Sequence, residues 1–411
     1  MTDSVNKICI IVGASHSGCQ VAESVRKSGW QGRIILLGDE PHLPYHRPPL
    51  SKDFLLGDKE IGDILIRPQS IYEKNDIELK LSTRVETINR DEKAILLDDG
   101  ESLGYDKLIL AIGARARRIS IEGDDKEGVC YLRTADDIEQ IKKFVKAKGK
   151  AVIVGGGYIG LETAAVLRKL EMDVTIIEMM PRILQRVTAP DVSEFYHRIH
   201  TEEDVNIVTD AVVEKIQGDE SVSQVICKDG QSFEADIVII GVGVVPNVEI
   251  ADKAGIEVNK NGIVVDEFCK SSDPNVFAIG DCTWHYNSIY DRWMRLESVP
   301  NAIDQARVAG AAVCGVLDKP YNQLPWFWSD QYDLKLQIAG LSQGFDDVVI
   351  RGDNKSGRKF AAFYFEADRL LAVDAVNMPI AFMFAKRIIA NDTKVDKTKI
   401  ADETVELKSL L

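Results

Sequence analysis

The sequence has few of the features that mark secreted, membrane-spanning or metal-binding proteins. Its seven cysteines are scattered and form no Cys-x-x-Cys pair, which favours reduced thiols in a cytoplasmic protein over a disulfide framework. Its six histidines show neither His-Glu-x-x-His nor Cys/His ligand spacing, so no metal site is expected. No apolar run approaches the roughly 20 residues of a membrane helix. The opening MTDSVNK has no basic stretch followed by an apolar core, so we expect no signal peptide and a cytoplasmic location.

Positive charge is also in short supply. Lysine and arginine number 50 against 65 aspartates and glutamates, which leaves a net charge of −15. That balance argues against nucleic acid or an anionic membrane as the partner, although one local basic face remains compatible with it. The length of 411 residues and the ordinary apolar content of 45% predict two or three globular domains, each with its own core.

The first candidate ligand site follows a buried strand near the N-terminus. Residues 8–12 (ICIIV) are apolar and largely β-branched, which predicts a parallel strand covered on both faces. The hexapeptide GASHSG (13–18) comes next, a helix is expected over 17–29, and a strand over 33–37 precedes Asp39. This order is that of a βαβ unit that binds a dinucleotide, with the acid placed to bind ribose hydroxyls.

The hexapeptide departs from the fingerprint Gly-x-Gly-x-x-Gly at its middle glycine, which is replaced by Ser15. Gly13 is expected at the tight turn, and Gly18 where helix and strand pack closely. The middle position needs only a small side chain, because the backbone must approach the phosphates there. A serine hydroxyl can itself donate to a phosphate oxygen. We therefore expect a nucleotide site despite the substitution.

An intact fingerprint, GGGYIG (155–160), marks a second unit of the same kind. A strand over 151–154 precedes it, and a helix over 161–170 and a strand over 174–177 follow, with Glu178 at the strand end. A carboxylate there accepts hydrogen bonds from the ribose hydroxyls of NAD and repels the 2′-phosphate of NADP. NADH is therefore the expected coenzyme. The strictness of that preference stays open, because Arg182 and Arg186 lie a little further on.

Two later segments indicate that the first dinucleotide is FAD. Residues 108–113 (LILAIG) are expected to form a strand ending in a small-residue turn, and residues 276–281 (VFAIGD) a strand ending in Gly280 and Asp281. A carboxylate there can bind a ribityl hydroxyl, and the glycine permits close backbone approach. Pro300 fits the first position of a helix expected to run to about Leu317, whose positive end would suit an anionic reduced flavin. Two nucleotide sites thus indicate two cofactors, FAD and NADH, that exchange electrons.

Six segments give the chain a specific family resemblance: GDEPHLPYHRPPLSKDFL (38–55), GGGYIGLE (155–162), AIGDC (278–282), YDRWMRLESVPNAIDQAR (290–307), PWFWSDQY (325–332) and AVDAVNMP (372–379). The chain resembles the flavoprotein ferredoxin reductases, a branch of the glutathione-reductase-like fold, over nearly its whole length. The resemblance implies an α/β protein with two Rossmann-like domains, for FAD and NAD, and a C-terminal α+β interface domain. The FAD domain would comprise residues 1–113 and 246–322, the NAD domain residues 114–245, and the interface domain residues 323–411.

The fingerprints and the resemblance together assign residues to each cofactor. The FAD site is expected to use Gly13, Ser15, Ser17, Gly18, Asp39, Lys52, Val85, Ala111, Gly113, Arg133, Gly280, Asp281, Val299 and Trp328. The NAD site is expected to use Gly155, Gly157, Tyr158, Ile159, Gly160, Glu162, Glu178 and Gly243.

The resemblance also implies the residues nearest the chemistry. Lys52 and Glu162 would form an ion pair near flavin N5 and the nicotinamide. Lys52 would stabilise negative charge on the reduced flavin, and Glu162 would orient Lys52 and the carboxamide. Neither would need to act as a general base. The sequence pattern alone is equally compatible with a solvated loop lysine and an acid on the surface of a helix.

The resemblance also implies that the electron acceptor is an acidic [2Fe-2S] ferredoxin that serves a cytochrome P450 or a Rieske oxygenase. A reductase of negative net charge then needs a local basic face, for which Arg67, Arg307, Lys335 and Lys386 are candidates; each also fits an ordinary surface residue. The aromatic cluster of Trp326, Phe327, Trp328 and Tyr332 is expected to pack in a core or at a domain interface. A second hypothesis is that Trp328 shields the flavin ring and lies on the electron path to the partner.

Three other functions are compatible with a flavin-binding fold of this kind. A disulfide reductase, oxidase or peroxidase of the same fold needs a reactive cysteine beside the flavin, and no cysteine occurs between Cys19 and Cys130, where PYHRPPLSK stands instead. A rubredoxin reductase differs mainly in its partner and stays open. A flavin-binding signalling protein with slow turnover, like apoptosis-inducing factors, is disfavoured because no targeting segment or long basic insertion is visible.

Overall fold

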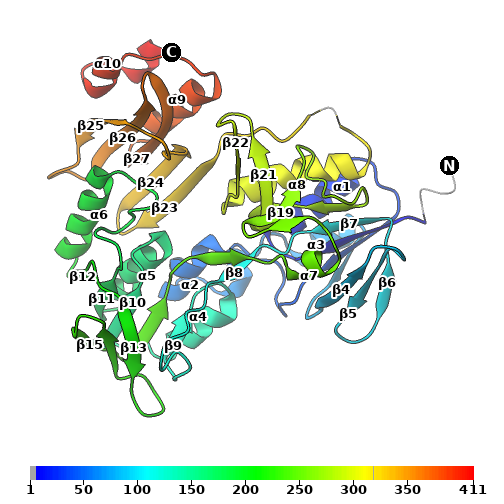
Figure 1. The fold of residues 1–411 in the computed structure, drawn as a ribbon, viewed down its shortest axis with the longest axis horizontal. Coiled ribbons are helices and arrows are strands. Elements are labelled where there is room, and N and C mark those ends of the chain that lie inside the picture. The colour runs from blue at the N-terminus through cyan, green and yellow to red at the C-terminus, as the bar shows by residue number, and fades with distance from the viewer. Residues whose placement is uncertain (1–5, 318) are drawn as a thin grey trace. The chain divides into compact units, whose positions relative to one another are not determined.

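A computed structural model of the chain describes residues 6–317 and 319–411 (Figure 1). These residues divide into two compact units. The first unit comprises the described residues up to His46, Ile61–Arg115 and the described part of Val244–Pro325. The second unit comprises Arg47–Glu60, Ala116–Gly243 and Trp326–Leu411. The short stretch that carries Lys52 therefore belongs to the second unit, although the first unit flanks it in sequence.

The first unit is built on a five-stranded parallel sheet with the order β20-β7-β1-β2-β3. The predicted strands and the predicted helix after the first fingerprint are confirmed. Helix α1 begins directly after the fingerprint turn and packs against α8 (Figure 1). The strands are β1 (Ile8–Val12), β2 (Arg33–Leu37), β3 (Ile77–Lys80), β7 (Lys107–Leu110) and β20 (Val276–Ala278), and the two helices are α1 (His16–Lys27) and α8 (Val299–Val313).

Helix α8 differs from its prediction at both ends. It starts at Val299, so Pro300 occupies its second position, and the Ser298 side chain caps it by accepting from Asn301 N at 3.3 Å. It ends at Val313, and a left-handed Gly315 (φ +84°) stops it before the predicted end. A serine cap and a glycine terminator are the usual signals for these boundaries.

Smaller elements complete the first unit. Strands β4, β5 and β6 form a sheet between β3 and β7 in sequence, and β18, β19, β21 and β22 form a sheet whose strands come before and after β20. These remaining elements are α3 (Gln69–Lys74), β4 (Val85–Asn89), β5 (Ala94–Leu97), β6 (Ser102–Gly104), β17 (Val244–Pro246), α7 (Glu249–Lys253), β18 (Val258–Asn259), β19 (Gly262–Val265), β21 (Thr283–Asn287) and β22 (Arg292–Met294), with 3-10 turns at Ile61–Ile64 and Gly280–Cys282; β8 (Ala114–Ala116) lies where the chain leaves the unit.

The second unit contains a parallel sheet of the same type, with the order β12-β11-β10-β16-β9. The predicted second βαβ arrangement is confirmed, and its helix begins at Tyr158, three residues earlier than predicted. The elements are β9 (Val129–Tyr131), α4 (Ala135–Lys142), β10 (Lys150–Val154), α5 (Tyr158–Lys169), β11 (Asp173–Ile177), α6 (Pro190–Glu202), β12 (Asn206–Val208), β13 (Val213–Gln217), β14 (Gln224–Cys227), β15 (Ser232–Glu234) and β16 (Ile237–Ile240), preceded by a 3-10 turn at Pro48–Ser51 and α2 (Asp53–Leu56).

The C-terminal part of the second unit is an antiparallel sheet with helices, which confirms the predicted α+β character. Its order is β23-β24-β27-β26-β25, α9 packs on β24 and β27, and α10 packs on β25 (Figure 1). Strand β23 also packs against α5. The elements are β23 (Trp326–Gln331), β24 (Leu334–Gly340), β25 (Asp347–Asp353), β26 (Lys359–Glu366), β27 (Arg369–Val376), α9 (Pro379–Ala390), α10 (Lys397–Ala401) and a 3-10 turn at Leu407–Leu410.

Two properties concern ligands and membranes. Within the described ranges, no helix combines the length and apolar character that a membrane span requires. The same residues contain no group of three or more His, Cys, Asp or Glu side chains that could hold a metal ion.

Candidate functional site: two dinucleotide turns and a buried ion pair

The two fingerprint turns have the same backbone geometry. Gly13 has a φ of +109°, and a Cβ atom there would lie 2.3 Å from the carbonyl oxygen of Ala111. A Cβ at Gly18 would lie 1.8 Å from the oxygen of Gly13. The corresponding atoms at Gly155 and Gly160 would meet backbone oxygens at 2.5 and 2.2 Å. Only glycine fits these four positions, so both turns meet the steric requirement of a dinucleotide site.

The structure explains why the first turn tolerates a serine. Gly157, the middle glycine of the intact fingerprint, has an extended backbone, and a Cβ built on it would meet no described atom within 4 Å. Ser15 holds the equivalent place with a similarly extended backbone, φ −127° and ψ −156°. A Cβ is sterically harmless at this position, so the departure at Ser15 leaves the turn intact.

The acids that follow the second strand of each βαβ unit, Asp39 and Glu178, do not occupy equivalent positions. Ile177 and Leu37 end the second strands, and each accepts a 2.8 Å hydrogen bond from the first fingerprint glycine. Glu178 follows Ile177 directly, whereas Gly38 holds that place in the first unit and Asp39 comes one residue later. Glu178 is buried and Asp39 is exposed. The two ribose-binding acids expected from sequence are therefore presented differently.

Glu178 is already part of the second turn. Its Oε2 accepts from Gly156 N at 2.7 Å, and its Oε1 accepts from Met180 N at 2.8 Å. Arg182, one of the two arginines that left the coenzyme preference open, donates to Ser193 Oγ and to Gln185 O. Arg182 is thus engaged within the chain.

Gln305, a residue of α8 that no sequence pattern indicated, forms hydrogen bonds with the turn at Gly280 and with Thr283. Gln305 Oε1 accepts from Gly280 N at 2.7 Å, and its amide nitrogen lies 3.1 Å from Thr283 Oγ1. Gly280 has a φ of +81°, and a Cβ there would lie 3.0 Å from Ser17 Oγ on α1. The first unit thus brings the fingerprint helix, the Gly280–Asp281 turn and α8 together.

The other residues expected at FAD fall in both units. In the first unit, Val85 and Ala111 are buried, Gly113 has a φ of +58° and accepts from Asn247 N, and Val299 is the first residue of α8. In the second unit lie Lys52, Arg133 and Trp328. Among the residues expected at NAD, Tyr158 starts α5, Ile159 is 42% exposed, and Gly243 is exposed with a φ of +99°.

The ion pair implied for Lys52 and Glu162 is present. Lys52 Nζ lies 2.6 Å from Glu162 Oε2, and the two side chains are 18% and 6% exposed. This burial rules out a solvated loop lysine and an acid on the helix surface. Lys52 also donates to Pro48 O at 3.2 Å, which fixes it at the end of the Pro48–Ser51 turn.

Two serines complete the surroundings of the carboxylate. Ser51 Oγ donates to Glu162 Oε2 at 2.6 Å, and Ser329 Oγ donates to Glu162 Oε1 at 2.6 Å. Both lie inside segments that carry the family resemblance, GDEPHLPYHRPPLSKDFL and PWFWSDQY. The signal for Ser329 was its place on the same strand face as Phe327 and Gln331, since alternate residues share a face.

The aromatic cluster divides between the two faces of β23. Phe327 packs on Tyr158 with ring centroids 5.1 Å apart. On the other face, Trp326 and Trp328 lie 5.6 Å apart, and Lys386 sits 5.0 Å from the Trp326 ring. The packing role predicted for the cluster therefore holds within the second unit, and the electron-path role of Trp328 stays a hypothesis.

The four candidate basic residues differ in whether they form an ion pair within the protein and in how exposed they are. Arg67 Nε contacts Glu23 Oε1 at 2.8 Å, and Arg307 contacts Asp304 at 3.0 Å with 61% of its side chain exposed. Lys335 is exposed on β24. Arg67 and Arg307 lie in the first unit, and Lys335 and Lys386 lie in the second.

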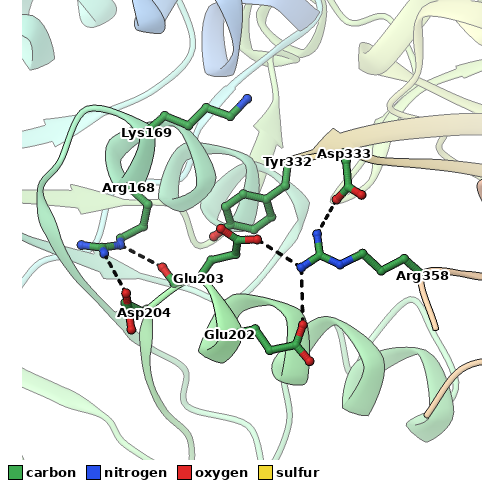
Figure 2. Close-up of a pocket in the computed structure, with 8 residues that line it drawn as sticks. All are labelled: Arg168, Lys169, Glu202, Glu203, Asp204, Tyr332, Asp333 and Arg358. Atoms are coloured by element: carbon green, nitrogen blue, oxygen red, sulfur yellow. Dashed lines mark hydrogen bonds and ion pairs between the residues drawn. The ribbon is translucent and has the colours of Figure 1, made fainter. Parts of the chain in front are cut away.

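An open hollow of about 450 Å³ in the second unit is separate from the residues expected at either cofactor (Figure 2). Its charges are largely paired with one another: Arg358 contacts Asp333, Glu202 and Glu203, and Arg168 contacts Asp204 (Figure 2). Tyr332 borders the hollow. Sequence reasoning gave no signal for it.

The thiols have no character of redox nucleophiles. All seven cysteines are free, and six are buried. Burial raises the pKa of Cys19 to about 12 and that of Cys130 to about 11. These thiols stay protonated near neutral pH, which agrees with the exclusion of a disulfide reductase.

Comparison with known proteins gives the class of the chain. Residues 7–306 match the pyridine nucleotide-disulphide oxidoreductase family, and residues 326–411 match the reductase C-terminal domain. The chain belongs to this oxidoreductase family.

Individual relatives refine that class. The chain is 42% identical to putidaredoxin reductase of Pseudomonas putida, covering 99% of this chain and 97% of that one. It is 40% identical to the ferredoxin reductase subunit of a 5,5'-dehydrodivanillate O-demethylase from Sphingobium, covering 98% of both. A crystal structure of the covalent putidaredoxin reductase–putidaredoxin complex matches with a TM-score of 0.95 and 42% identity, over 99% of this chain and 98% of that one. The resemblance to ferredoxin reductases is thereby confirmed.

Proposed function

We propose that this chain is an NADH-dependent ferredoxin reductase that passes electrons through FAD to an acidic [2Fe-2S] ferredoxin, which in turn serves a cytochrome P450 or Rieske oxygenase. The observation that carries the proposal is the pair of fingerprint turns with matching geometry at Gly13 and Gly155. A dehydrogenase with one cofactor needs only one such turn. When bound, FAD supplies the chemistry that side chains lack, because it accepts two electrons as hydride and releases them singly.

The first unit has the features that FAD requires. The turn at Gly13 presents the start of α1 to the pyrophosphate, and Ser17 lies beside it. Gln305 holds Gly280 so that Asp281 can accept a hydrogen bond from a ribityl hydroxyl. The N-terminal end of α8, at Val299, provides a positive dipole for negative charge on the reduced flavin.

The second unit has the features that NADH requires. Glu178 shapes the turn through Gly156 N and offers carboxylate oxygens to the ribose hydroxyls. Lys52 supplies a fixed positive charge to stabilise the reduced flavin, and Glu162 holds Lys52 and orients the carboxamide. Neither side chain moves a proton in this account.

The partner assignment rests on relatives and on charge. The matched structure contains putidaredoxin, and the Sphingobium relative is a ferredoxin reductase subunit. Because the net charge is −15, encounter with an acidic partner needs local cations. Arg307 and Lys335 are exposed, and Lys386 lies over Trp326. Arg67 forms an ion pair with Glu23.

The test is NADH-driven reduction of cytochrome c by the FAD-loaded protein, with and without an added [2Fe-2S] ferredoxin. The expected rate rises steeply with ferredoxin and saturates. If the rate did not change with ferredoxin while NADH still bleached the flavin, the ferredoxin assignment would be contradicted. Rubredoxin would then be the next acceptor to test. If NADH did not bleach the flavin, the proposed hydride transfer from NADH to FAD would be contradicted.

A further inference from the structure

Five side chains of the second unit form an unbroken hydrogen-bonded chain that ends on the ion pair. Ser329 Oγ lies 2.6 Å from Glu162 Oε1 and 3.1 Å from Gln331 Nε2. Gln331 Oε1 lies 2.9 Å from His200 Nε2, and His200 Nδ1 lies 3.1 Å from Tyr332 OH. The first four residues are buried, and Tyr332 borders the hollow in Figure 2. The chain therefore runs from a buried carboxylate to the surface.

The direction of every hydrogen bond in this chain follows from the charge at Glu162. An ionised carboxylate only accepts hydrogen bonds, so the Ser329 hydroxyl must donate its single hydrogen to Glu162. Ser329 Oγ must then accept from the Gln331 amide nitrogen, which leaves the Gln331 carbonyl to accept from His200. His200 must carry its proton on Nε2, and its Nδ1 accepts from Tyr332 OH. A protonated Glu162 would permit the reverse order, with a flipped Gln331 amide and the other His200 tautomer.

Local structure holds the chain in place. Ser329 and Gln331 are alternate residues of β23, so both point to the face that packs on α5. Tyr332 follows in the hairpin turn with a left-handed backbone, φ +54°, an uncommon conformation for an aromatic residue. Its ring meets that of His200 edge-on, with centroids 5.1 Å apart.

His200 has the protonation state that this direction requires. Burial lowers the pKa of His200 to about 4, so the imidazole is neutral near pH 7 and can donate from one nitrogen while accepting at the other. Besides Gln331 and Tyr332, His197 acts on His200 through its charge. A neutral imidazole at this point keeps the hydrogen bonds in one direction without adding another buried charge.

We propose that Ser329, Gln331 and His200 are positioning residues that keep the Glu162 carboxylate turned toward Lys52 by a hydrogen-bond chain with a single direction. Three donors, from Lys52, Ser51 and Ser329, then share the two oxygens of one carboxylate. The consequence for hydride transfer rests on the proposed function, because it assumes that Lys52 and Glu162 act at the flavin and nicotinamide. The direction of the chain does not depend on that assumption.

The direct test is the tautomer of His200, read by 15N NMR of the FAD-loaded protein labelled at histidine nitrogen. Comparison with His200→Gln assigns the His200 signal, and His197→Gln, on the exposed face of the same helix, assigns the signal of the neighbouring histidine. The expected result at pH 7 is a neutral ring protonated at Nε2. A ring protonated at Nδ1, or at both nitrogens, would overturn the proposal.

The second test separates positioning from simple packing. Ser329→Ala removes the donor to Glu162, so the Nδ1–H form of His200 should appear although the substitution is two links away. The rate of flavin reduction by NADH should fall about tenfold, as expected for one lost hydrogen bond to a charged group, with little change in NADH affinity. Ser329→Thr keeps the hydroxyl and should restore both readouts.

The outcomes distinguish the two proposals. An unchanged His200 tautomer in Ser329→Ala would overturn the proposed hydrogen-bond chain, whichever acceptor the enzyme reduces. A wild-type flavin that NADH does not reduce would overturn the proposed function, while the wild-type tautomer would still decide the direction of the chain.

Discussion

Lys52 Nζ and Glu162 Oε2 lie 2.6 Å apart although 110 residues separate them in sequence. The lysine ends the turn of Pro48–Ser51, and the glutamate lies in the second turn of α5. Two serines, Ser51 and Ser329, donate to the same carboxylate. A buried acid with one cation and two hydroxyl donors is held in one orientation, as a site that must place charge beside reacting groups requires.

Removing the cation should cost both stability and rate. Lys52→Met leaves the Glu162 carboxylate buried without its partner, and breaking a buried pair costs about 3 kcal/mol. We expect a lower thermal midpoint of the FAD-loaded protein and slower flavin reduction by NADH in stopped-flow measurements. The double variant Lys52→Met/Glu162→Gln should recover the midpoint and leave the rate low. Recovery of the rate together with the midpoint would contradict a role for Lys52 in the chemistry.

The fingerprint geometry predicts opposite results for two neighbouring glycines. Gly157→Ser should preserve NADH affinity, because a Cβ there meets no described atom and Ser15 already stands at the equivalent place. Gly160→Ala should weaken NADH binding severely, because its Cβ would lie 2.2 Å from Gly155 O. Fluorescence titration with NADH measures both affinities. Equal losses in the two variants would show that the steric account of the turn is wrong.

Glu178 should set the choice between NADH and NADPH. Glu178→Gln removes the charge that repels a 2′-phosphate and weakens the acceptor for Gly156 N and Met180 N. We expect kcat/KM for NADH to fall about tenfold, equivalent to about 1.4 kcal/mol, and the NADH-to-NADPH ratio to fall with it. Asp173→Asn, at the exposed start of the same strand, is the control. A loss of activity with an unchanged ratio would assign Glu178 to the turn alone.

Asp374 should make stability depend on pH. Burial raises the pKa of Asp374 from its ordinary 3.8 to about 7, with Tyr364 OH donating to it. Its folded form therefore binds a proton that the unfolded chain releases, so its contribution is greatest below about pH 4 and is lost as pH rises through about 7. The loss amounts to about 4 kcal/mol.

The matched variant for this effect is Asp374→Asn. The difference in thermal midpoint between Asp374→Asn and the parent should grow in favour of the variant from about pH 5 to about pH 8. His200 acts in the opposite sense: its pKa is lowered, so its contribution is present above its ordinary pKa of 6.5 and is lost as pH falls through about 4. A midpoint difference that is constant with pH would contradict a titrating Asp374.

Sequence patterns predicted the elements of both nucleotide units, because a buried β-branched run, a glycine turn and a helix are local signals. They also placed α8, with errors at both ends that Ser298 and Gly315 explain. They did not reveal that Asp39 lies one residue beyond the position of Glu178, since that follows from the pairing of neighbouring strands.

The surroundings of Glu162 were only partly predictable for a similar reason. A strand pattern indicates that Ser329 and Gln331 share a face, but it does not say what that face meets. Their partners, Glu162 and His200, are 167 and 131 residues away in sequence. Such contacts depend on tertiary packing, which local periodicity does not specify.

The most direct test of the central claim is an anaerobic two-step mixing experiment. The FAD-loaded protein is first mixed with one equivalent of NADH and then with oxidised [2Fe-2S] ferredoxin, while flavin and iron–sulfur absorbance are followed separately. The account predicts that NADH bleaches the flavin and that ferredoxin reoxidises it with reduction of about two ferredoxins per flavin, because a hydride carries two electrons. A flavin that is bleached but stays reduced in the presence of ferredoxin would contradict it.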